Sequence, residues 1–444
     1  MLSILRHPTY RALFLAQVVA LVGTGLATVA LGLLAYDLAG ADAGVVLGGA
    51  LAIKMVAYIG VGPAANAFAD RLPRKTLLVS MDLVRAAVAL LLPFVDQVWQ
   101  VYVLIFLLQS ASAAFTPTFQ AIIPDILPEE AQYTRALSLS RLAYDLESVV
   151  SPILAAALLT IISFNWLFSG TVVGFLASAA LVISAAVPRV ARPSVRRDVF
   201  DRTTRGSLIY LRTPRLRGLL ALTLAAAAVG AFVIVNTIVL VRVELGRPAN
   251  DVAVALAAFG GGSMVAALLL PRVLDRRPDR PVMLVSAALL VLGLLATAGL
   301  LATPSVDSWL VILWLWPVLG LAYSAVQTPG GRLLRRSSSP DDRSALFAAQ
   351  FALSHGCWLL AYSIAGWFGA RAGLPVTAAI LAGVAAAGLA AALVVWPRRD
   401  PEIIEHAHPD LPADDPHLLG AEHGRHAHAF VIDDEHSTWP RPGL

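Results

Sequence analysis

Charged residues are scarce in this chain of 444 residues: Asp, Glu, Lys and Arg make up 14% of it, against about 25% in an average soluble domain. This scarcity excludes an ordinary soluble enzyme. The sequence also lacks a nucleophile elbow, a helix with paired zinc-binding histidines and a phosphate loop, so we expect no enzymatic activity, no catalytic residue and no cofactor. A single cysteine, Cys357, excludes an intrachain disulfide and any multi-cysteine metal site.

Hydrophobic residues, by contrast, make up 58% of the sequence, and apolar runs of about twenty residues recur along its length. A helix of that length crosses the hydrocarbon layer of a membrane, which is about 30 Å thick. The first run continues from about Tyr10 past Ala30 without a cleavage site, so we expect it to remain as a span. We predict an all-α membrane protein with twelve transmembrane helices, near residues 10–36, 43–66, 76–95, 98–122, 134–162, 165–187, 216–241, 251–274, 281–302, 308–330, 344–368 and 374–396.

Positive charges are distributed unevenly between the loops. Of the 33 Lys and Arg residues, 27 lie in the N-terminal segment, the loops from even- to odd-numbered spans, the segment 188–215 and the tail, counting four that lie at most two residues inside a span end, whereas three lie in the opposite loops. The positive-inside rule therefore predicts that both termini lie in the cytoplasm, with the spans in the inner membrane of a bacterium. Because the cations lie in short loops, they suit anionic lipid and exclude nucleic acid as a partner.

Similar charged segments follow the second and the eighth spans. An acid, an arginine and a proline recur in both, which read Asp70-Arg71-Leu72-Pro73-Arg74-Lys75 and Asp275-Arg276-Arg277-Pro278-Asp279-Arg280. The first segment resembles the loop motif of the major facilitator superfamily, with Asn66 and Pro73 in place of the two glycines of that motif. The resemblance covers about residues 5–397.

This resemblance implies two six-helix halves, 1–187 and 216–397, joined by a basic cytoplasmic linker, 188–215. We expect a monomer that works by alternating access. The charges of the two similar segments are then expected to latch one state of the transporter, and the predicted gating residues are Asp70, Arg71, Arg74, Lys75, Asp275, Arg276 and Arg280.

Three further stretches, 230–237, 260–264 and 347–358, look like the branch of this superfamily that includes nickel-resistance permeases of the Nre type. Those proteins are thought to export nickel and often end in a histidine-rich tail. The resemblance therefore implies efflux of a transition-metal cation such as nickel.

Charged side chains inside a span are costly, at about 2.5–3.5 kcal/mol each on insertion scales, so each needs a partner or a function. The fifth span contains Arg141, Asp145 and Glu147. Arg141 and Asp145 share a helix face, whereas Glu147 lies about 200° around the helix from Asp145. At least one of the two acids is expected to bind protons and the cargo in turn, so that binding of one releases the other. The alternative is a buried Arg141 and Asp145 pair with Glu147 bonded to a serine or to the backbone.

Two more ionisable groups lie inside spans. Lys54 of the second span is expected to reach either His355 or an acid of the fifth span, as a transport residue or as a structural counter-ion. His355 is either a metal ligand and proton relay or a satisfied core group. Asp82 and Arg85 lie near the cytoplasmic end of the third span, where we expect them to snorkel and to pair with loop charges.

Polar residues of other spans complete the expected site. In the superfamily the spans that carry them line a cavity, and the alternative is a set of ordinary interhelical hydrogen bonds. These residues are Gln17, Gln109, Asn236, Tyr323 and Gln327.

The last segment, 398–444, is expected to be a disordered cytoplasmic tail rich in histidine and acidic residues. Histidine-rich tracts bind metal ions, although a solvated acidic tail with incidental histidines is equally consistent with the composition. The predicted metal ligands are His406, His408, His423, His426, His428 and His436.

Together these features predict a secondary transporter in the lipid bilayer that exports a transition-metal cation, nickel first, in exchange for protons. The alternative is export of a small organic molecule such as a drug or a siderophore. A membrane metal sensor is a third possibility, favoured by the tail.

Overall fold

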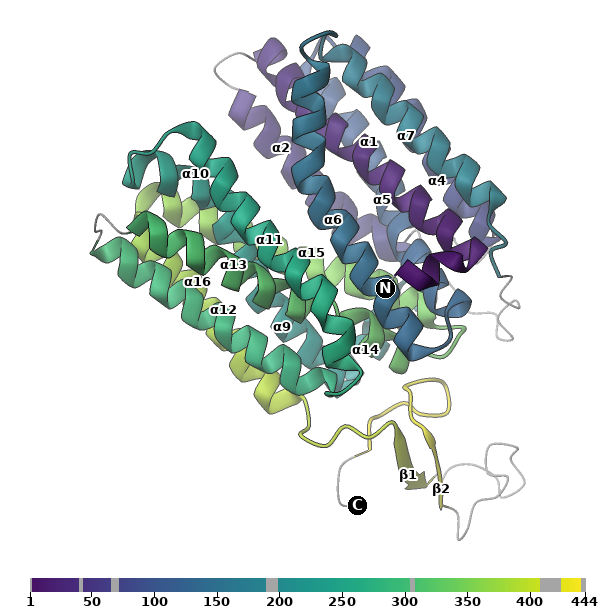
Figure 1. Cartoon of the computed structure of the whole chain (residues 1–444). Helices are drawn as coiled ribbons and strands as arrows, with labels where there is room; N and C mark the ends of the chain where they lie inside the picture. The colour runs from purple at the N-terminus through teal and green to yellow at the C-terminus, as the bar shows by residue number, and fades with distance from the viewer. Residues whose placement is uncertain are drawn as a thin grey trace.

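The computed structural model describes residues 2–39, 43–64, 72–188, 199–303, 308–407 and 425–440. Nearly all of this is helical, and the helices form two bundles that follow each other along the chain (Figure 1). Within the part of the chain that the structure describes, ten helices are long and apolar enough to cross a membrane. They match ten of the twelve predicted spans, all but the second and the fifth.

The N-terminal half, residues 2–188, contains the helices on the purple to blue part of the chain in Figure 1. They are the 3-10 turn η1 (Leu2–Arg6), α1 (Pro8–Ala39), α2 (Ala43–Val56), the π-helical turn η3 (Ala57–Val61), α4 (Arg74–Leu91), the 3-10 turn η4 (Leu92–Phe94), α5 (Val98–Ile126), α6 (Glu130–Leu158) and α7 (Asn165–Ser184). The predicted second span corresponds to α2 and η3, and the fifth to α6, which carries the interior charges.

The C-terminal half follows the linker helix α8 (Val199–Arg212). It contains α9 (Pro214–Ala231), the π-helical turn η5 (Phe232–Asn236), α10 (Thr237–Val239), the π-helical turn η6 (Leu240–Glu244), α11 (Ala249–Leu274), α12 (Asp279–Ala302), α13 (Ser308–Gln327), α14 (Gly330–Arg336), α15 (Arg343–Arg371) and α16 (Leu374–Val395).

Large apolar side chains face outward all along the bundle. Trp314 of α13 is 79% exposed, and Val394 of α16 is 85% exposed. A soluble protein rarely exposes large contiguous apolar patches, so this surface is suited to lipid. Inside the C-terminal half, Ala and Leu pack into one large core in which side chains such as Leu222 are fully buried. The N-terminal half has two smaller cores, one around Leu13 and one around Phe168.

Helices α11 and α13 approach each other closely because each has a glycine that faces the backbone of the other helix. A Cβ atom at Gly262 would lie 1.9 Å from the carbonyl oxygen of Pro317, and one at Gly320 would lie 1.8 Å from that of Phe259. Neither position can hold a side chain without separating the helices. Within the run Gly260–Gly262, Gly262 is therefore the glycine that serves close helix packing, because a Cβ atom at Gly260 or Gly261 would meet no atom within 4 Å among the described residues.

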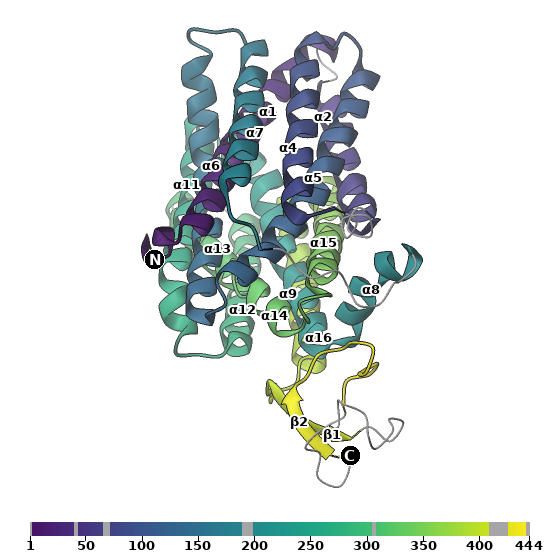
Figure 2. The same ribbon diagram turned by 90° about the vertical axis from the view of Figure 1, so that its right-hand side faces the viewer.

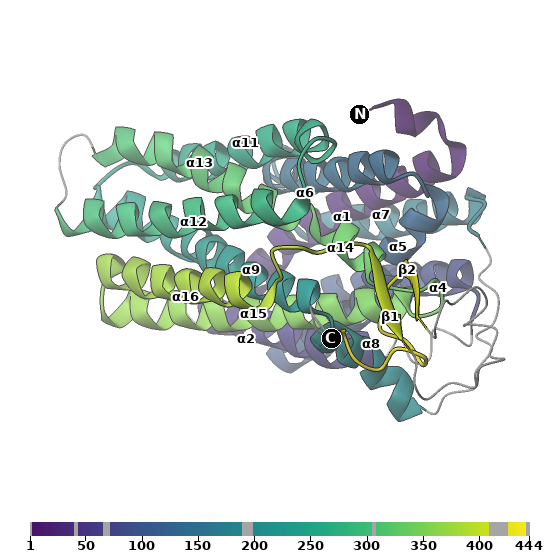
Figure 3. The same cartoon turned by 90° about the horizontal axis from the view of Figure 1, so that it is seen from below.

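The two halves touch along α6 and α11, and along α15, which contacts α5 and η3 (Figures 1 and 2). Past α16 the tail forms the strands β1 (Ile403–Ala407) and β2 (Arg425–Ala429), which pair antiparallel. The tail lies at one end of the bundle, next to α8 (Figure 3). The sequence predicts disorder for this segment, whereas the structure places a two-stranded sheet there.

Candidate functional site

Interior charges of α6 connect the two halves near the middle of the bundle. Arg141 Nη2 lies 2.9 Å from Asp145 Oδ1, which is the pair that the four-residue spacing suggests. The hydroxyl of Ser263 in α11 accepts a hydrogen bond from Arg141 Nε (3.2 Å) and donates one to Asp145 Oδ2 (2.7 Å). The guanidinium also lies 4.7 Å from the centre of the Tyr323 ring in α13. These four residues, the Arg141 cluster, join the N-terminal half to the C-terminal half.

Glu147 faces another side of α6. Its Oε1 lies 2.7 Å from where a Cβ atom on Gly25 of α1 would be, so this glycine leaves room for the carboxylate. Lys54 of α2 is the opposite charge with which Glu147 interacts. The side chains of Asp145 and Glu147 therefore face different neighbouring helices, as their separation of about 200° around the helix requires.

Tyr58 of η3 connects Lys54 with the C-terminal half. Lys54 Nζ lies 5.5 Å from the centre of the Tyr58 ring, and the Tyr58 hydroxyl donates a hydrogen bond to Gln109 Oε1 (2.8 Å). The ring packs edge-on against His355 of α15, with 4.5 Å between the ring centres. We call Lys54, Tyr58, Gln109, Glu147 and His355 the Lys54 cluster.

The proton of His355 can be placed from its hydrogen bond. Its Nδ1 lies 2.7 Å from the carbonyl oxygen of Phe351. A carbonyl oxygen only accepts, so Nδ1 is the donor and Nε2 remains available as an acceptor or a metal ligand.

Aromatic side chains follow one face of α15. Phe351, His355, Trp358 and Tyr362 are spaced by four, three and four residues, which places them in one row on the helix. The first two contact Tyr58 of the N-terminal half, and Trp358 lies 6.2 Å from Tyr323 and 5.1 Å from Tyr362, measured between ring centres. At 1.5 Å per residue, His355 lies about 18 Å along α15 from its start at Arg343, close to mid-membrane depth.

The remaining polar residues predicted to line a cavity also lie inside the bundle. Gln17 of α1 accepts a hydrogen bond from the Ser140 hydroxyl of α6 (3.0 Å). Gln327 donates to the Tyr323 hydroxyl (3.5 Å), and Asn236 is 2% exposed in the π-helical turn η5. Their role in binding a cargo stays a prediction.

Asp82 and Arg85 are placed differently from our expectation. They pair with each other inside the N-terminal half, and Asp82 Oδ2 also accepts a hydrogen bond from the Ser178 hydroxyl (2.8 Å). The Arg85 guanidinium lies between the rings of Phe115 and Phe175, at 4.1 Å and 4.5 Å from their centres. The expectation of snorkelling was wrong, because two rings and a carboxylate from neighbouring helices provide the solvation that water would give.

Ion pairs close one end of the bundle between the halves. Asp125 at the end of α5 accepts hydrogen bonds from Arg74 of α4 (2.7 Å) and from Arg343 at the start of α15. Arg74 Nη2 also donates to the Ser344 hydroxyl of α15 (3.1 Å). The acid of one half thus holds an arginine from each half.

Arg332 of α14 makes a second set of contacts at the same end. It donates to the Thr134 hydroxyl of α6 (2.8 Å) and pairs with Glu130 of α6 and, at 3.1 Å, with Asp279 of α12. We call these two sets, centred on Asp125 and on Arg332, the clasp. It lies at the end of the bundle that also carries α14 and the tail (Figure 2).

Of the seven predicted gating residues, Arg74 is part of the clasp. Lys75 donates to a backbone carbonyl after α7 (2.9 Å) and Arg280 to one after α16 (3.2 Å), so each binds within its own half. Asp275 and Arg276 are exposed on the turn after α11, and Asp70 and Arg71 lie outside the described residues.

Four main partners in the clasp were not predicted from the sequence: Asp125, Glu130, Arg332 and Arg343. A signal for them is present: acids follow the fourth span, and arginines follow the tenth, at the equivalent place in the other half. Opposite charges at equivalent loops of two halves are expected to meet when those ends close.

Among the predicted metal ligands of the tail, the structure brings together His406, His426, His428 and His436. One nitrogen or more of each ring lies within 4.8 Å of the others. Burial and the neighbouring imidazoles lower the pKa of His406 to about 4. The other two predicted ligands, His408 and His423, lie outside the described residues.

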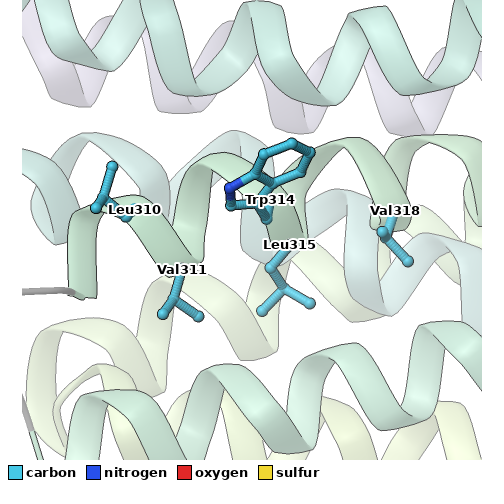
Figure 4. A pocket seen from close by; sticks show the side chains of 5 residues that line it. All are labelled: Leu310, Val311, Trp314, Leu315 and Val318. Carbon is cyan, nitrogen blue, oxygen red and sulfur yellow. The ribbon is translucent and has the colours of Figure 1, made fainter.

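A hollow of about 380 Å³ lies on the outer surface of α13 (Figure 4). Leu310, Val311, Trp314, Leu315 and Val318 line it, and all five side chains are apolar. It opens on the lipid-facing side of the bundle, so it suits an acyl chain rather than a polar cargo.

Comparison with known proteins identifies a family whose model spans both halves, and relatives that match about two thirds of the chain. The family model of the Major Facilitator Superfamily matches residues 13–245 and 218–414. Macrolide efflux protein A of Enterococcus faecalis is 26% identical over 301 residues, which cover 64% of this chain and 90% of that protein. The protein of the same name from Streptococcus pyogenes is also 26% identical, over 63% of this chain and 72% of that protein.

Solved structures share the fold at low identity. The human organic anion transporter MFSD10 (TETRAN) superposes with a TM-score of 0.72 at 12% identity, over 87% of this chain and 99% of that one. A bacterial homologue of the iron transporter ferroportin in the outward-facing state gives a TM-score of 0.73 at 15% identity, over 87% and 98%. These structural similarities show the fold, and neither they nor the sequence relatives support the Nre-type nickel branch.

Proposed function

Since this chain belongs to the major facilitator superfamily, we propose that it exports a small amphipathic organic molecule across the cytoplasmic membrane of a bacterium, in exchange for protons. The observation that carries this proposal is the aromatic row of α15, which lies at mid-membrane depth between the Lys54 cluster and the Arg141 cluster. Aromatic walls with a few placed polar groups are typical of sites that bind organic ligands.

Relatives support an organic cargo. The two similar efflux proteins are named for macrolides, which are organic molecules. We therefore place the organic exporter ahead of the nickel exporter that the sequence analysis put first.

The charge next to His355 argues against a metal ion as cargo at the Lys54 cluster. Lys54 Nζ and the His355 ring lie 5.5 Å and 4.5 Å from the centre of the Tyr58 ring, so they are at most about 10 Å apart. When Glu147 is protonated and no longer offsets the charge of Lys54, a dication on His355 would be repelled by the ammonium group by roughly 3 kcal/mol at an effective dielectric constant of about 20. An organic molecule that stacks on the aromatic row meets no such penalty.

We assign proton exchange to Glu147. Asp145 is held by Arg141 and Ser263, whereas the charge facing Glu147 is Lys54, which belongs to another helix. When Glu147 takes up a proton, Lys54 loses the carboxylate charge that opposes its own, while its contact with the aromatic face of Tyr58, 5.5 Å from Nζ, remains. Protonation of one carboxylate thereby changes how α2 and α6 interact.

The clasp provides the closed end that alternating access requires. It holds the two halves together at one end, and the positive-inside rule assigns that end to the cytoplasm. Opening toward the cytoplasm then requires that the clasp breaks while the opposite ends of the halves approach each other.

Efflux from a bacterial host that lacks its own drug pumps tests the proposal. The host carries the wild-type chain, Glu147→Gln or the matched control Asp37→Asn, an exposed acid near the end of α1, and is exposed to macrolides, organic dyes and metal salts. We expect wild type and control to export at least one organic compound, and Glu147→Gln to lose proton-driven export in inverted vesicles. Resistance to metal salts alone, or proton-driven export that survives Glu147→Gln, would contradict the proposal.

A further inference from the structure

Four histidines of the tail meet on one face of the β1 and β2 sheet. His406 of β1 lies opposite His426 of β2 in the antiparallel register, and His428 follows two residues later on the same face. His436, which comes after β2 along the chain, lies over this face, with its Nε2 3.0 Å from His406 Nε2. His406 is 8% exposed and His436 is 4% exposed, whereas His426 and His428 are half-buried, so the site is partly shielded from water.

Hydrogen bonds orient three of the four rings. In each of them Nδ1 faces an oxygen: His406 that of Ile404 (2.9 Å), His428 that of Ala429 (2.9 Å), and His436 a carboxylate oxygen of Asp433 (2.7 Å). The carbonyl oxygens only accept, and Asp433 accepts as a carboxylate, so Nδ1 carries the proton in these rings. The lone pair of each of these rings therefore lies on Nε2, which is the arrangement that second-shell groups impose on metal-binding histidines.

The donor set selects a class of metal. Neutral imidazoles suit Co²⁺, Ni²⁺, Cu²⁺ and Zn²⁺, whereas Mg²⁺, Ca²⁺ and Mn²⁺ prefer oxygen ligands. Four nitrogens at the 2.0–2.1 Å typical of zinc would lie roughly 3.3–3.4 Å from one another in a tetrahedron. The spread of up to 4.8 Å here needs only small side-chain movements to reach that geometry.

We propose that these four imidazoles bind one dication of a late first-row transition metal, and that the bound ion fastens the tail to the linker helix α8. This site is separate from the membrane-embedded clusters, and it goes beyond the proposed export of an organic molecule. It acts as a cytoplasmic metal sensor joined to the transporter.

Contacts between the tail and α8 link the metal site to the bundle. Arg205 of α8 pairs with Asp434, two residues before His436, at 2.8 Å, and with Asp342 just before α15 at 2.5 Å. Arg212 of α8 donates to the carbonyl oxygen of Ser437 (3.2 Å). The segment that carries the fourth ligand thus binds α8 on both sides of that ligand.

The same segment packs against the C-terminal half. Phe430 and Ile432 are 3% and 4% exposed in its core. Helix α8 in turn packs closely on α15, because a Cβ atom at Gly206 would lie 2.0 Å from the carbonyl oxygen of Ala345. A metal ion that orders the tail therefore also favours one position of α8 against α15, close to Arg343 of the clasp.

Metal binding is measured first on the full chain, purified in detergent through a histidine-free affinity tag. Zn²⁺, Co²⁺ and Ni²⁺ are titrated in turn, and X-ray absorption of the zinc-loaded chain reports its ligands. We expect one tightly bound ion per chain with four nitrogen ligands at about 2.0–2.1 Å. A first shell of oxygen or sulfur, or the absence of a stoichiometric ion, would overturn the proposal.

Variants identify the ligands. His406→Ala and His436→Ala are expected to weaken binding by at least roughly 100-fold, and Asp433→Asn, which removes a group that orients His436, by roughly 10- to 100-fold. His7→Ala serves as the control and should bind the metal as wild type does, since His7 lies outside the cluster. Unchanged binding in the tail variants would assign the metal to another site.

Hydrogen exchange over residues 199–212 tests the link to α8. Zn²⁺ is expected to slow exchange there a few-fold in the wild-type chain and to have no such effect after chelation. Asp434→Asn keeps all four ligands but removes a partner of Arg205, so it should bind Zn²⁺ normally and lose the effect on α8. If Zn²⁺ leaves α8 unchanged in the wild type, the link is wrong. None of these measurements involves transport, so they remain decisive even if export of organic molecules is not found.

Discussion

Neutralising Asp125 should open the end of the bundle that the clasp closes. This carboxylate accepts hydrogen bonds from Arg74 of its own half and from Arg343 of the other half. Asp125→Asn keeps the size of the side chain and removes the charge that holds both arginines. The two guanidinium groups then face each other without a shared acid, which favours separation of the halves.

The magnitude follows from the partners and their exposure. A hydrogen bond to a charged group is worth about 1.5–3 kcal/mol, and the side chains here are 12–18% exposed, so solvent screens them in part. We expect a loss of about 2 kcal/mol from the closed state, which lowers the ratio of closed to open molecules roughly 30-fold. The contacts of Arg332 remain, so the closed state is weakened rather than abolished.

Distance measurements between spin labels provide the assay. Because Cys357 is the one cysteine of the chain, a Cys357→Ser background accepts labels at Glu129→Cys and Asp341→Cys, two exposed positions on opposite halves near the clasp. We expect Asp125→Asn to add a population with a longer distance, and Asp96→Asn, an exposed acid between α4 and α5, to leave the distribution unchanged. An unchanged distribution in Asp125→Asn would refute the role of the clasp.

Two further predictions concern the packing of each half, and both are checked by thermal unfolding in detergent. Gly262→Ala should destabilise the chain by about 2–3 kcal/mol, because the new Cβ atom meets the backbone of Pro317. The control Gly260→Ala on the same helix should be neutral, because its Cβ atom meets no atom within 4 Å among the described residues. Equal melting temperatures of the two variants would contradict the close approach of α11 and α13. Asp82→Asn should lower the free energy of unfolding by about 3–5 kcal/mol, because it leaves Arg85 buried without its counter-ion. Asp96→Asn is the exposed control. A wild-type melting temperature for Asp82→Asn would show that the rings of Phe115 and Phe175 are sufficient to stabilise the charge of Arg85.

Local features of the sequence were sufficient to predict much of the fold. Ten of the twelve predicted spans coincide with helices long and apolar enough to cross a membrane, because span length and apolarity are properties of a single continuous segment. The same holds within α6. Arg141 and Asp145 are four residues apart and therefore share a helix face, whereas Glu147 is two residues after Asp145 and therefore faces another side. Helical geometry alone determines such relations.

The partners across the bundle depended on the tertiary structure. Ser263, which closes the Arg141 cluster, lies 118 residues from Asp145, and Arg343 lies 218 residues from Asp125 in the clasp. No local pattern relates residues so far apart, since their meeting depends on how the two halves pack. The position of Arg85 could not be predicted from the sequence either. Its place in the span suggested that it lies at the membrane surface, whereas rings from α5 and α7 hold it inside the bundle.

For the tail, too, the sequence predicted the kind of site and the tertiary structure decided which residues form it. Its composition alone identified histidines as metal-binding candidates, because imidazole is a metal ligand wherever it occurs. Which of them share a site was decided by the register of β1 and β2 and by the return of the chain that carries His436 over that sheet. A ligand set is a set of distances between side chains, and only the folded chain determines those distances.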